Sequence, residues 1–335
     1  MNPLASVIVL NHNGMAFLEK CFNSLKNQSY PNYEVIMVDN ASTDNSIEYV
    51  KRNFPWIKLI QSNTNLGYAG GNNLGAKKAR GKYLVFLNND TYVDYYWLEE
   101  LVNAVENHKD IALAQSLILD YEKKGIVQCA GLYLIKECGW TWVFCKDIPY
   151  ETFLEKYDSR MIDIFAGLGA SIIIPKEVFQ KIGGFDDRFF IYSEETDLSW
   201  RIWLKGYRVV LAPKSRVYHK LGGSASKLKQ EFNEFHRTKN VIRMLIKNYS
   251  TINLFVYLPF SFLMMFMRAV FYLFVKRTSI HFLVLIKAIS WNLRNLGDTL
   301  TYRKFVQNKI RKVSDRKLKY VMKTLPLSEI FRRMK

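Results

Sequence analysis

The chain has 335 residues, of which 49% are apolar and 23% are charged. This composition is typical of a globular protein and excludes a disordered tail, a collagen-like repeat and a small disulfide-rich scaffold. The net charge of +18 is confined to the last third, because residues 1–220 carry 25 basic and 25 acidic side chains while residues 221–335 carry 23 basic and 5 acidic. Such a region indicates a nucleic acid or an anionic membrane as partner.

The first 110 residues alternate short apolar runs with amphipathic stretches, which predicts strands joined by helices in a parallel sheet. The expected strands are 6–10, 33–38, 57–61 and 83–87, and the expected helices are 16–27, 44–52, 70–79 and 96–107. Further strands are expected at 111–119, 126–135, 162–174, 207–212 and 216–218, with a helix over 194–205. The fold class is therefore α/β, a mostly parallel sheet flanked by helices.

From about residue 227 the pattern is helical to the end of the chain, and the segment LGGSAS at 221–226 is the nearest sign of a boundary. The four cysteines form no C-x-x-C pair, and a strand pattern begins at Leu4 where a secretory signal would stand. We therefore expect a catalytic part in a reducing, cytoplasmic compartment.

The run 254–275 is apolar, contains one charge at Arg268 and is long enough to cross a bilayer. Arg268 would cost about 2.5–3.5 kcal/mol at the centre of a span, and Pro259 interrupts the run. A single span would also place a tail with 16 basic and 3 acidic residues opposite the cytoplasmic part, against the positive-inside tendency.

The sequence therefore favours peripheral or monotopic attachment to the cytoplasmic face of the cell membrane, and it disfavours a nucleic-acid partner. An apolar membrane-associating helix is expected at about 252–275 and an amphipathic helix at about 280–297. A buried helical core or a homo-oligomer interface is the alternative for these segments.

Polar residues follow each of the first four predicted strands, at the sheet edge where ligands bind in open parallel sheets. They are Asn11, His12, Asn13 and Gly14, then Asp39, Asn40, Ala41 and Ser42, then Asn63, Asn65 and Gly67, then Asn88, Asn89 and Asp90. One such cluster is an ordinary turn, but four in succession indicate a ligand site. The loop NHNG after the first strand does not supply G-x-G-x-x-G, and the sequence has no G-x-x-x-x-G-K-[ST] motif, so a Rossmann dinucleotide site and a phosphate loop are disfavoured.

Four segments resemble the family 2 inverting glycosyltransferases of the GT-A fold, and most of all their rhamnosyl- and galactofuranosyltransferase branch. They are SVIVLNHNG, VDNASTDNS, NLGYAGGNNLGAKKARGKYLVFLNND and the stretch from GASIIIPKEVF through SEETDLSWR to SRVYH. The resemblance covers about residues 4–225. It implies a catalytic domain over 1–225 ahead of a helical basic region over 226–335, a TDP- or UDP-sugar donor, and transfer of one sugar to a hydroxyl of a glycan or lipid-linked acceptor.

The resemblance also implies roles for matched residues. Nucleotide-sugar binding is expected of Asn11, Asn13, Asp39, Asn65, Gly67, Gly71, Asn72 and Asn89. Asp90 stands at the family's D-x-D motif, whose first position is Asn88 here, and with His219 it is expected to bind Mg²⁺ or Mn²⁺. Gly169 and Asp186 match the acceptor side, with turn capping as the alternative for Asp186. Trp140 and Trp142 are expected to stack on a sugar or lipid, or simply to pack.

The segment SEETD places three carboxylates within four residues, which indicates a function or a bound cation. On a helix Glu194 and Asp197 share one face with Arg201, while Glu195 points about 100° away. The resemblance implies that Glu195 is the catalytic base, with Glu194 as the next candidate. Asp197 is a third candidate, and a salt bridge to Arg201 is its alternative role.

Two other classes of function stay open from the sequence. A nucleotidyltransferase also uses a carboxylate-held metal on a similar sheet, but it normally has a basic Gly-rich loop after the first strand, which NHNG lacks. A non-catalytic membrane-bound scaffold that binds sugar nucleotides would keep the sheet edge but has no need for the carboxylates of SEETD.

Overall fold

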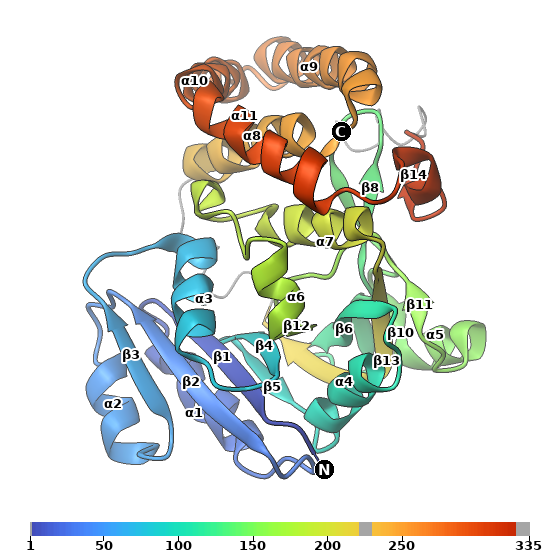
Figure 1. The fold of residues 1–335 in the computed structure, drawn as a ribbon. Coiled ribbons are helices and arrows are strands. Elements are labelled where there is room, and N and C mark those ends of the chain that lie inside the picture. Colours follow the sequence, from blue (N-terminus) through green and yellow to red (C-terminus); the bar gives the residue numbers. More distant parts are fainter. Residues whose placement is uncertain (1, 221–229, 326–335) are drawn as a thin grey trace.

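The computed structural model describes residues 2–220 and 230–325 (Figure 1). The helices are α1 Met15–Leu25, α2 Ser46–Asn53, α3 Gly67–Lys78, α4 Trp97–Glu106, α5 Tyr150–Tyr157, α6 Lys176–Lys181, α7 Glu194–Lys205, α8 Gln230–Asn248, α9 Thr251–Phe274, α10 Ile280–Arg294 and α11 Leu296–Phe305. The expected boundary at 221–226 and the expected helix start at 227 lie outside the described residues.

The strands are β1 Ala5–Asn11, β2 Tyr33–Asn40, β3 Lys58–Ser62, β4 Tyr83–Asn88, β5 Thr91–Val93, β6 Ile111–Asp120, β7 Ile126–Cys129, β8 Leu132–Ile135, β9 Thr141–Val143, β10 Ile148–Pro149, β11 Ile162–Asp163, β12 Ser171–Pro175, β13 Arg208–His219 and β14 Met322–Lys323. The main sheet has the order β10-β7-β6-β12-β4-β1-β2-β3, with β5, β11 and β13 attached to it. A small second sheet has the order β14-β8-β9.

The first four expected strands are confirmed, and they pair in parallel within the main sheet. β1 lies between β2 and β4, with Asn11 opposite Asp39 and Leu10 opposite Asn88. The buried apolar residues of β1, β2 and β4, such as Val7, Ile36 and Val85, explain why these three runs are almost continuously hydrophobic. Because the strands are parallel, their polar carboxyl ends meet at one edge of the sheet.

The middle of the chain differs from the sequence prediction in three places. The expected strand 126–135 divides into β7 and β8, which belong to different sheets, because Gly131 turns the chain with φ +126°; a Cβ there would lie 2.6 Å from Ile164. The expected strand 162–174 divides into β11 and β12. The two short strands expected at 207–212 and 216–218 join into β13, which carries an irregularity between Ala212 and Arg216.

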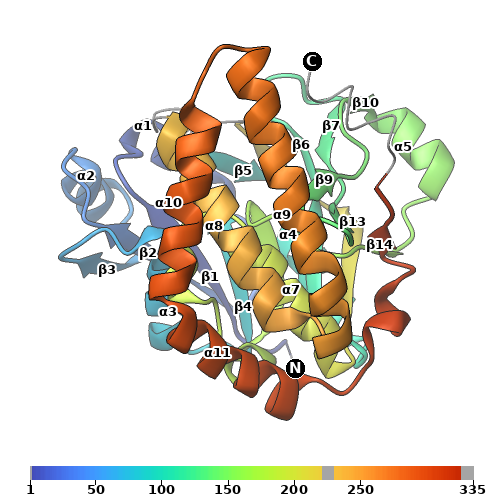
Figure 2. The same ribbon diagram turned by 90° about the horizontal axis from the view of Figure 1, so that it is seen from above.

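The helices α8 to α11 form a layer on the side of the molecule away from the N-terminus (Figure 1). Seen from above, α9 and α10 run side by side over α8 (Figure 2). Pro259 lies inside α9 without ending it, and α9 is long and apolar enough to cross a membrane. The expectation of helix to the chain end was wrong: after α11 come irregular turns, and β14 pairs with β8.

Candidate active site

The carboxyl ends of β1, β2 and β4 bring together three of the residues expected to bind the nucleotide. The Nδ2 of Asn11 lies 3.4 Å from Oδ1 of Asp39, and Nδ2 of Asn89 donates a hydrogen bond of 2.7 Å to Oδ1 of Asn11. All three side chains are buried. The polar residues that end or follow three separate strands therefore form one connected cluster at the edge of the sheet, which we call the polar edge.

The loop after β1 is tied to the loop after β2 through Asn13. Its backbone has φ 52°, and its Oδ1 accepts a hydrogen bond of 2.7 Å from the backbone N–H of Thr43. Its own N–H donates to Oγ of Ser42, whose N–H in turn donates to Oδ2 of Asp39 at 3.0 Å. Asp39 therefore closes a local turn with one oxygen while the other faces Asn11.

The start of α3 is held by Asn40, which the sequence indicated only as a member of the polar cluster after the second strand. Its Nδ2 donates to Oδ1 of Asn65 at 2.9 Å, and its Oδ1 accepts from the N–H of Leu66. Gly67 follows with φ +70°, and a Cβ at this position would lie 2.3 Å from the carbonyl oxygen of Phe190. Only glycine allows this approach, so α3 begins directly against the segment that precedes α7.

Two other residues expected to bind the sugar nucleotide lie on the buried side of α3. Gly71 lies against Leu10 of β1, and Asn72 donates a hydrogen bond of 3.0 Å to the carbonyl of Tyr68 in its own helix. Both residues are buried. The contacts that the structure gives them are therefore packing and helix contacts.

Asp90 and His219 are brought together by the pairing of β13 with β5. Nε2 of His219 lies 3.5 Å from Oδ1 of Asp90, which has no hydrogen-bond partner among the described residues. Gln128 donates from Nε2 to the backbone carbonyl of His219, which places its Oε1 2.7 Å from Nδ1 of the same histidine. With Nδ1 as the donor to Oε1 of Gln128, the lone pair of a neutral His219 lies on Nε2 and faces Asp90.

Two acceptors that face each other across 3.5 Å are the arrangement that a cation bridges, so these residues fit a divalent metal ion. Within residues 2–220 and 230–325, no three His, Cys, Asp or Glu side chains are grouped to hold a metal. A cation at Asp90 and His219 would therefore take its remaining ligands from substrate and water.

The segment before α7 has an unusual backbone. Phe190, Tyr192 and Ser193 all have φ between 66° and 70°, a conformation that is costly for side chains other than glycine and that clusters at functional sites. Asn240 of α8 holds this segment by donating from Nδ2 to the carbonyls of Ile191 and Tyr192 at 2.8 and 2.7 Å. The sequence pattern gave no sign that Asn240 has this role.

Glu194 and Glu195 begin α7 immediately after the strained segment. Each has a buried Oε2 atom with no hydrogen-bond partner in the described part of the chain. Burial raises the pKa of Glu195 above its ordinary value of 4.5, and hydrogen bonds from its own backbone and that of Gly169 oppose the rise. Burial, and next the charge of Glu195, raise the pKa of Glu194 well above 4.5. Gly169, expected on the acceptor side, therefore lies beside Glu195.

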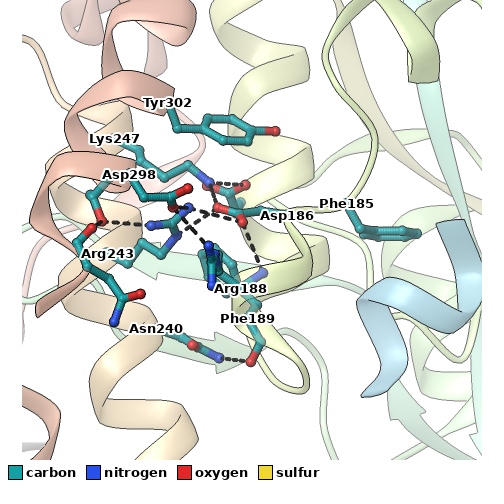
Figure 3. Close-up of polar contacts among 12 residues, drawn as sticks. Phe185, Asp186, Arg188, Phe189, Asn240, Arg243, Lys247, Asp298 and Tyr302 are labelled. Carbon is teal, nitrogen blue, oxygen red and sulfur yellow. Dashed lines mark hydrogen bonds and ion pairs between the residues drawn. The ribbon is translucent and has the colours of Figure 1, made fainter. Parts of the chain in front are cut away.

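Asp186 lies in a buried ion-pair network with Arg243 and Lys247 of α8 (Figure 3), and Asp197 of α7 joins this network through Lys247. Asp197 pairs with Arg201 at 2.8 Å, as one of the sequence alternatives had it, and with Lys247 at 3.0 Å. Asp186 pairs with Lys247 at 2.5 Å and with Arg243 at 2.8 Å. Burial alone would raise the pKa of Asp186, but Lys247 and Arg243 hold it well below its ordinary value.

A cavity of about 520 Å³ opens beside Glu195, between the small sheet, the start of α7 and the helices α8, α9 and α10. Its lining residues are Leu132, Gly139, Trp140, Thr141, Trp142, Val143, Leu168, Tyr192, Ser193, Glu195, Thr196, Arg237, Thr238, Val241, Met265, Arg268, Tyr272, His281 and Leu285. Trp140, Trp142 and Glu195 thus share one cavity, whereas Glu194, Asp186 and Asp197 are absent from its walls. The sequence did not indicate Arg237 or Tyr192, and it showed Arg268 only as the lone charge of an apolar run.

Comparisons with known proteins identify the family and the fold. The family model for glycosyl transferase family 2 matches residues 6–183. The O-antigen biosynthesis protein RfbC of Myxococcus xanthus is 29% identical over 225 residues, which is 65% of this chain and 17% of the relative. An uncharacterized glycosyltransferase of Haemophilus influenzae is 37% identical over 110 residues, which is 32% of this chain and 44% of the relative. The chain thus spans less than half of either relative.

Solved structures share the fold. GalNAc-T7 with UDP, GalNAc and Mn²⁺ superposes with a TM-score of 0.59 at 21% identity, over 75% of this chain and 49% of that one. The mannosyltransferase PcManGT from Pyrobaculum calidifontis, in complex with GDP-Man and Mn²⁺, has a TM-score of 0.54 at 16% identity and covers 92% of this chain and 86% of its own. The family match, which spans more than half of the sequence, and the GT-A architecture together show that this chain belongs to glycosyl transferase family 2.

Proposed function

We propose that the protein is an inverting glycosyltransferase that moves one sugar from a nucleotide-diphosphate donor to a hydroxyl group of a glycan. The observation that carries this proposal is Glu195, which lines a cavity together with Trp140 and Trp142 and has a carboxylate oxygen without a hydrogen-bond partner in residues 2–220 and 230–325. Sugar sites combine apolar rings of this kind with a few polar groups. UDP and GDP-Man in the solved structures of similar fold support a nucleotide-sugar donor.

In the proposed reaction Glu195 accepts the proton of the acceptor hydroxyl while the hydroxyl oxygen attacks the anomeric carbon of the donor. The bond from that carbon to the diphosphate breaks on the opposite side, and the diphosphate leaves with the electron pair, so the configuration inverts. The raised pKa of Glu195 makes its ionised form a stronger base than an ordinary glutamate.

The donor would lie along the polar edge formed by Asn11, Asp39 and Asn89, where Asp90 and His219 would hold Mg²⁺ or Mn²⁺. When bound, the cation neutralises charge on the diphosphate as it departs. The orphaned Oδ1 of Asp90 and the lone pair of His219 support this assignment. So does the Mn²⁺ in the two solved structures of similar fold.

The acceptor in this proposal is a lipid-linked glycan, and the protein works at the cytoplasmic face of the cell membrane. The similarity to an O-antigen biosynthesis protein supports a surface glycan. Large apolar side chains are exposed on α9 and α10, among them Phe255 at 77%, Phe274 at 75% and Leu293 at 65%. Arg268 turns away from this exposed surface and pairs with Glu234 of α8 at 3.0 Å.

The helices α9 and α10 would lie at the membrane–water interface rather than span the bilayer, because the inner side of α9 is packed against the rest of the protein. Met264, Met265 and Ala269 are buried there. Exposed basic residues, including Lys276, Arg277 and Arg294, flank the apolar side chains, and each basic residue near an anionic membrane contributes about 1 kcal/mol of attraction.

The test is the Glu195→Gln variant, compared with Glu155→Gln at an exposed position of α5 as a matched control. Nucleotide binding is first measured with a panel of UDP-, TDP- and GDP-sugars in the presence of Mn²⁺, and the bound donor is then used in a transfer assay. Glu195→Gln is expected to lower kcat about 10²–10⁴-fold and to leave donor affinity unchanged. Normal turnover by this variant would refute the assignment of the base, and a loss confined to Glu194→Gln would transfer the role to Glu194.

A further inference from the structure

The cavity beside Glu195 has a cationic part that the proposed chemistry does not use. We propose that Arg237 and Arg268 bind the phosphate or diphosphate group through which the acceptor glycan is attached to its lipid. This inference rests on the proposed function, because it assigns the cavity to the acceptor.

The two arginines come from different helices and reach the same cavity. Arg237 of α8 has its guanidinium 4.6 Å from the ring centre of Tyr192, and Arg268 of α9 pairs with Glu234 at 3.0 Å. A guanidinium has five N–H donors in a planar fork, so one ring contact or one carboxylate leaves donors for a second partner. Phosphate oxygens match this fork, and two arginines are a common arrangement for binding a phosphate group.

His281 provides a second, independent sign that a ligand belongs here. It lines the cavity from α10 and is 6% exposed, and its Nε2 has no hydrogen-bond partner among the described residues. Its Nδ1 lies 3.7 Å from the same Glu234 that pairs with Arg268. A buried polar atom without a partner is costly, and a ligand with polar oxygens removes that cost.

The charges in the cavity favour an anion at this end. Among the described residues of the lining, Arg237 and Arg268 are accompanied by a single carboxylate, that of Glu195. Glu234 compensates part of the positive charge from behind Arg268 and does not line the cavity. The base and the cationic groups thus share one cavity, as a glycan with an anionic anchor requires.

The surroundings of the arginines favour a lipid-linked anion over a free one. Met265 and Tyr272 of α9 and Leu285 of α10 line the inside of the cavity, while Phe266 and Ile286 on the same helices are half exposed on the outside. The two helices, side by side in Figure 2, are therefore apolar towards the cavity and towards solvent. A phosphate held by Arg268 would lie next to the surface that we propose rests on the membrane.

The experiment measures binding of farnesyl diphosphate to the full chain in EDTA, which suppresses diphosphate binding at the proposed cation site. Arg237→Met is expected to weaken binding about tenfold or more, since a hydrogen-bonded contact to a charged group is lost. Arg268→Gln combined with Glu234→Gln is expected to have a similar effect without leaving Glu234 unpaired. Lys287→Met, an exposed charge on α10, serves as the control and is expected to change nothing; thermal melts verify that every variant is folded.

Unchanged affinity in both arginine variants would refute the anion site. Binding of inorganic diphosphate shows whether the anion that the site takes is lipid-linked or free. If inorganic diphosphate binds more weakly than farnesyl diphosphate, the site is for a lipid-linked group. If the two bind equally well and with the same dependence on Arg237, the site is for a free phosphate compound. Donor binding with Mn²⁺ is measured on the same proteins. Its absence from the wild type would refute the proposed function, while an Arg237-dependent affinity for farnesyl diphosphate would still uphold the anion site.

Discussion

Removal of the Lys247 ammonium is the most direct way to test how the C-terminal helices hold α7. Lys247 of α8 is fully buried and pairs with Asp186 at 2.5 Å and with Asp197 at 3.0 Å. At an effective dielectric constant of 20, each pair is worth about 6 kcal/mol before desolvation. Burial lowers the pKa of Lys247 although the two carboxylates act to raise it, so desolvation opposes that attraction.

Lys247→Met is expected to lower the free energy of unfolding by about 3 kcal/mol, near the lower end of the range for breaking a buried ion pair. The lower end applies because in this variant Asp186 still pairs with Arg243 and Asp197 still pairs with Arg201. The measurement is urea unfolding followed by circular dichroism. Lys82→Met, which removes an exposed partner of Glu106, is the control, with an expected loss of at most about 1 kcal/mol. An equal effect of the two variants would refute the view that this network stabilises the protein.

Three further predictions concern the site and the membrane. The base acts when it is ionised, and burial raises the pKa of Glu195. In a plot of kcat/KM against pH, the midpoint of the acidic limb should therefore lie above pH 4.5. A midpoint at or below pH 4.5 would contradict this. Gln128→Leu removes the group that orients His219, so the Mn²⁺ concentration for half-maximal transfer should rise about 10–100-fold; an unchanged Mn²⁺ titration would count against the cation site. Phe255→Glu with Phe274→Glu should weaken sedimentation with anionic vesicles by at least about 100-fold, while Tyr96→Glu, exposed on another part of the surface, should not.

The sequence predicted those parts of the fold that depend on local pattern. The runs around Val7, Ile36 and Val85 are buried on both faces of a parallel sheet, so their hydrophobicity marks strands directly. The division of 126–135 depends on Gly131, whose positive φ is imposed by close packing against Ile164. That contact joins residues far apart in the chain, and a pattern of neighbouring residues does not contain it.

The same distinction applies to the candidate site. Asn11, Asp39 and Asn89 were predictable because parallel strands bring their carboxyl ends to one edge. For Asp186 and Asp197 the sequence left open a role at the substrate and a local structural role, and the structure buries both with Lys247, which lies 61 and 50 residues further along the chain. A charged residue looks the same in the sequence whether its partner is a substrate or a distant lysine.

The side chains of the polar edge and those of the far wall of the cavity come from different stretches of the chain, so they can be engineered separately. The polar edge is built by the ends of β1, β2 and β4, whereas the far wall of the cavity comes from α8, α9 and α10. On the proposed assignment, a library that varies Met265, Tyr272 and Leu285 would explore new acceptors without altering any side chain at the donor edge. Donor choice and acceptor choice could then be evolved in the laboratory as separate traits of one enzyme.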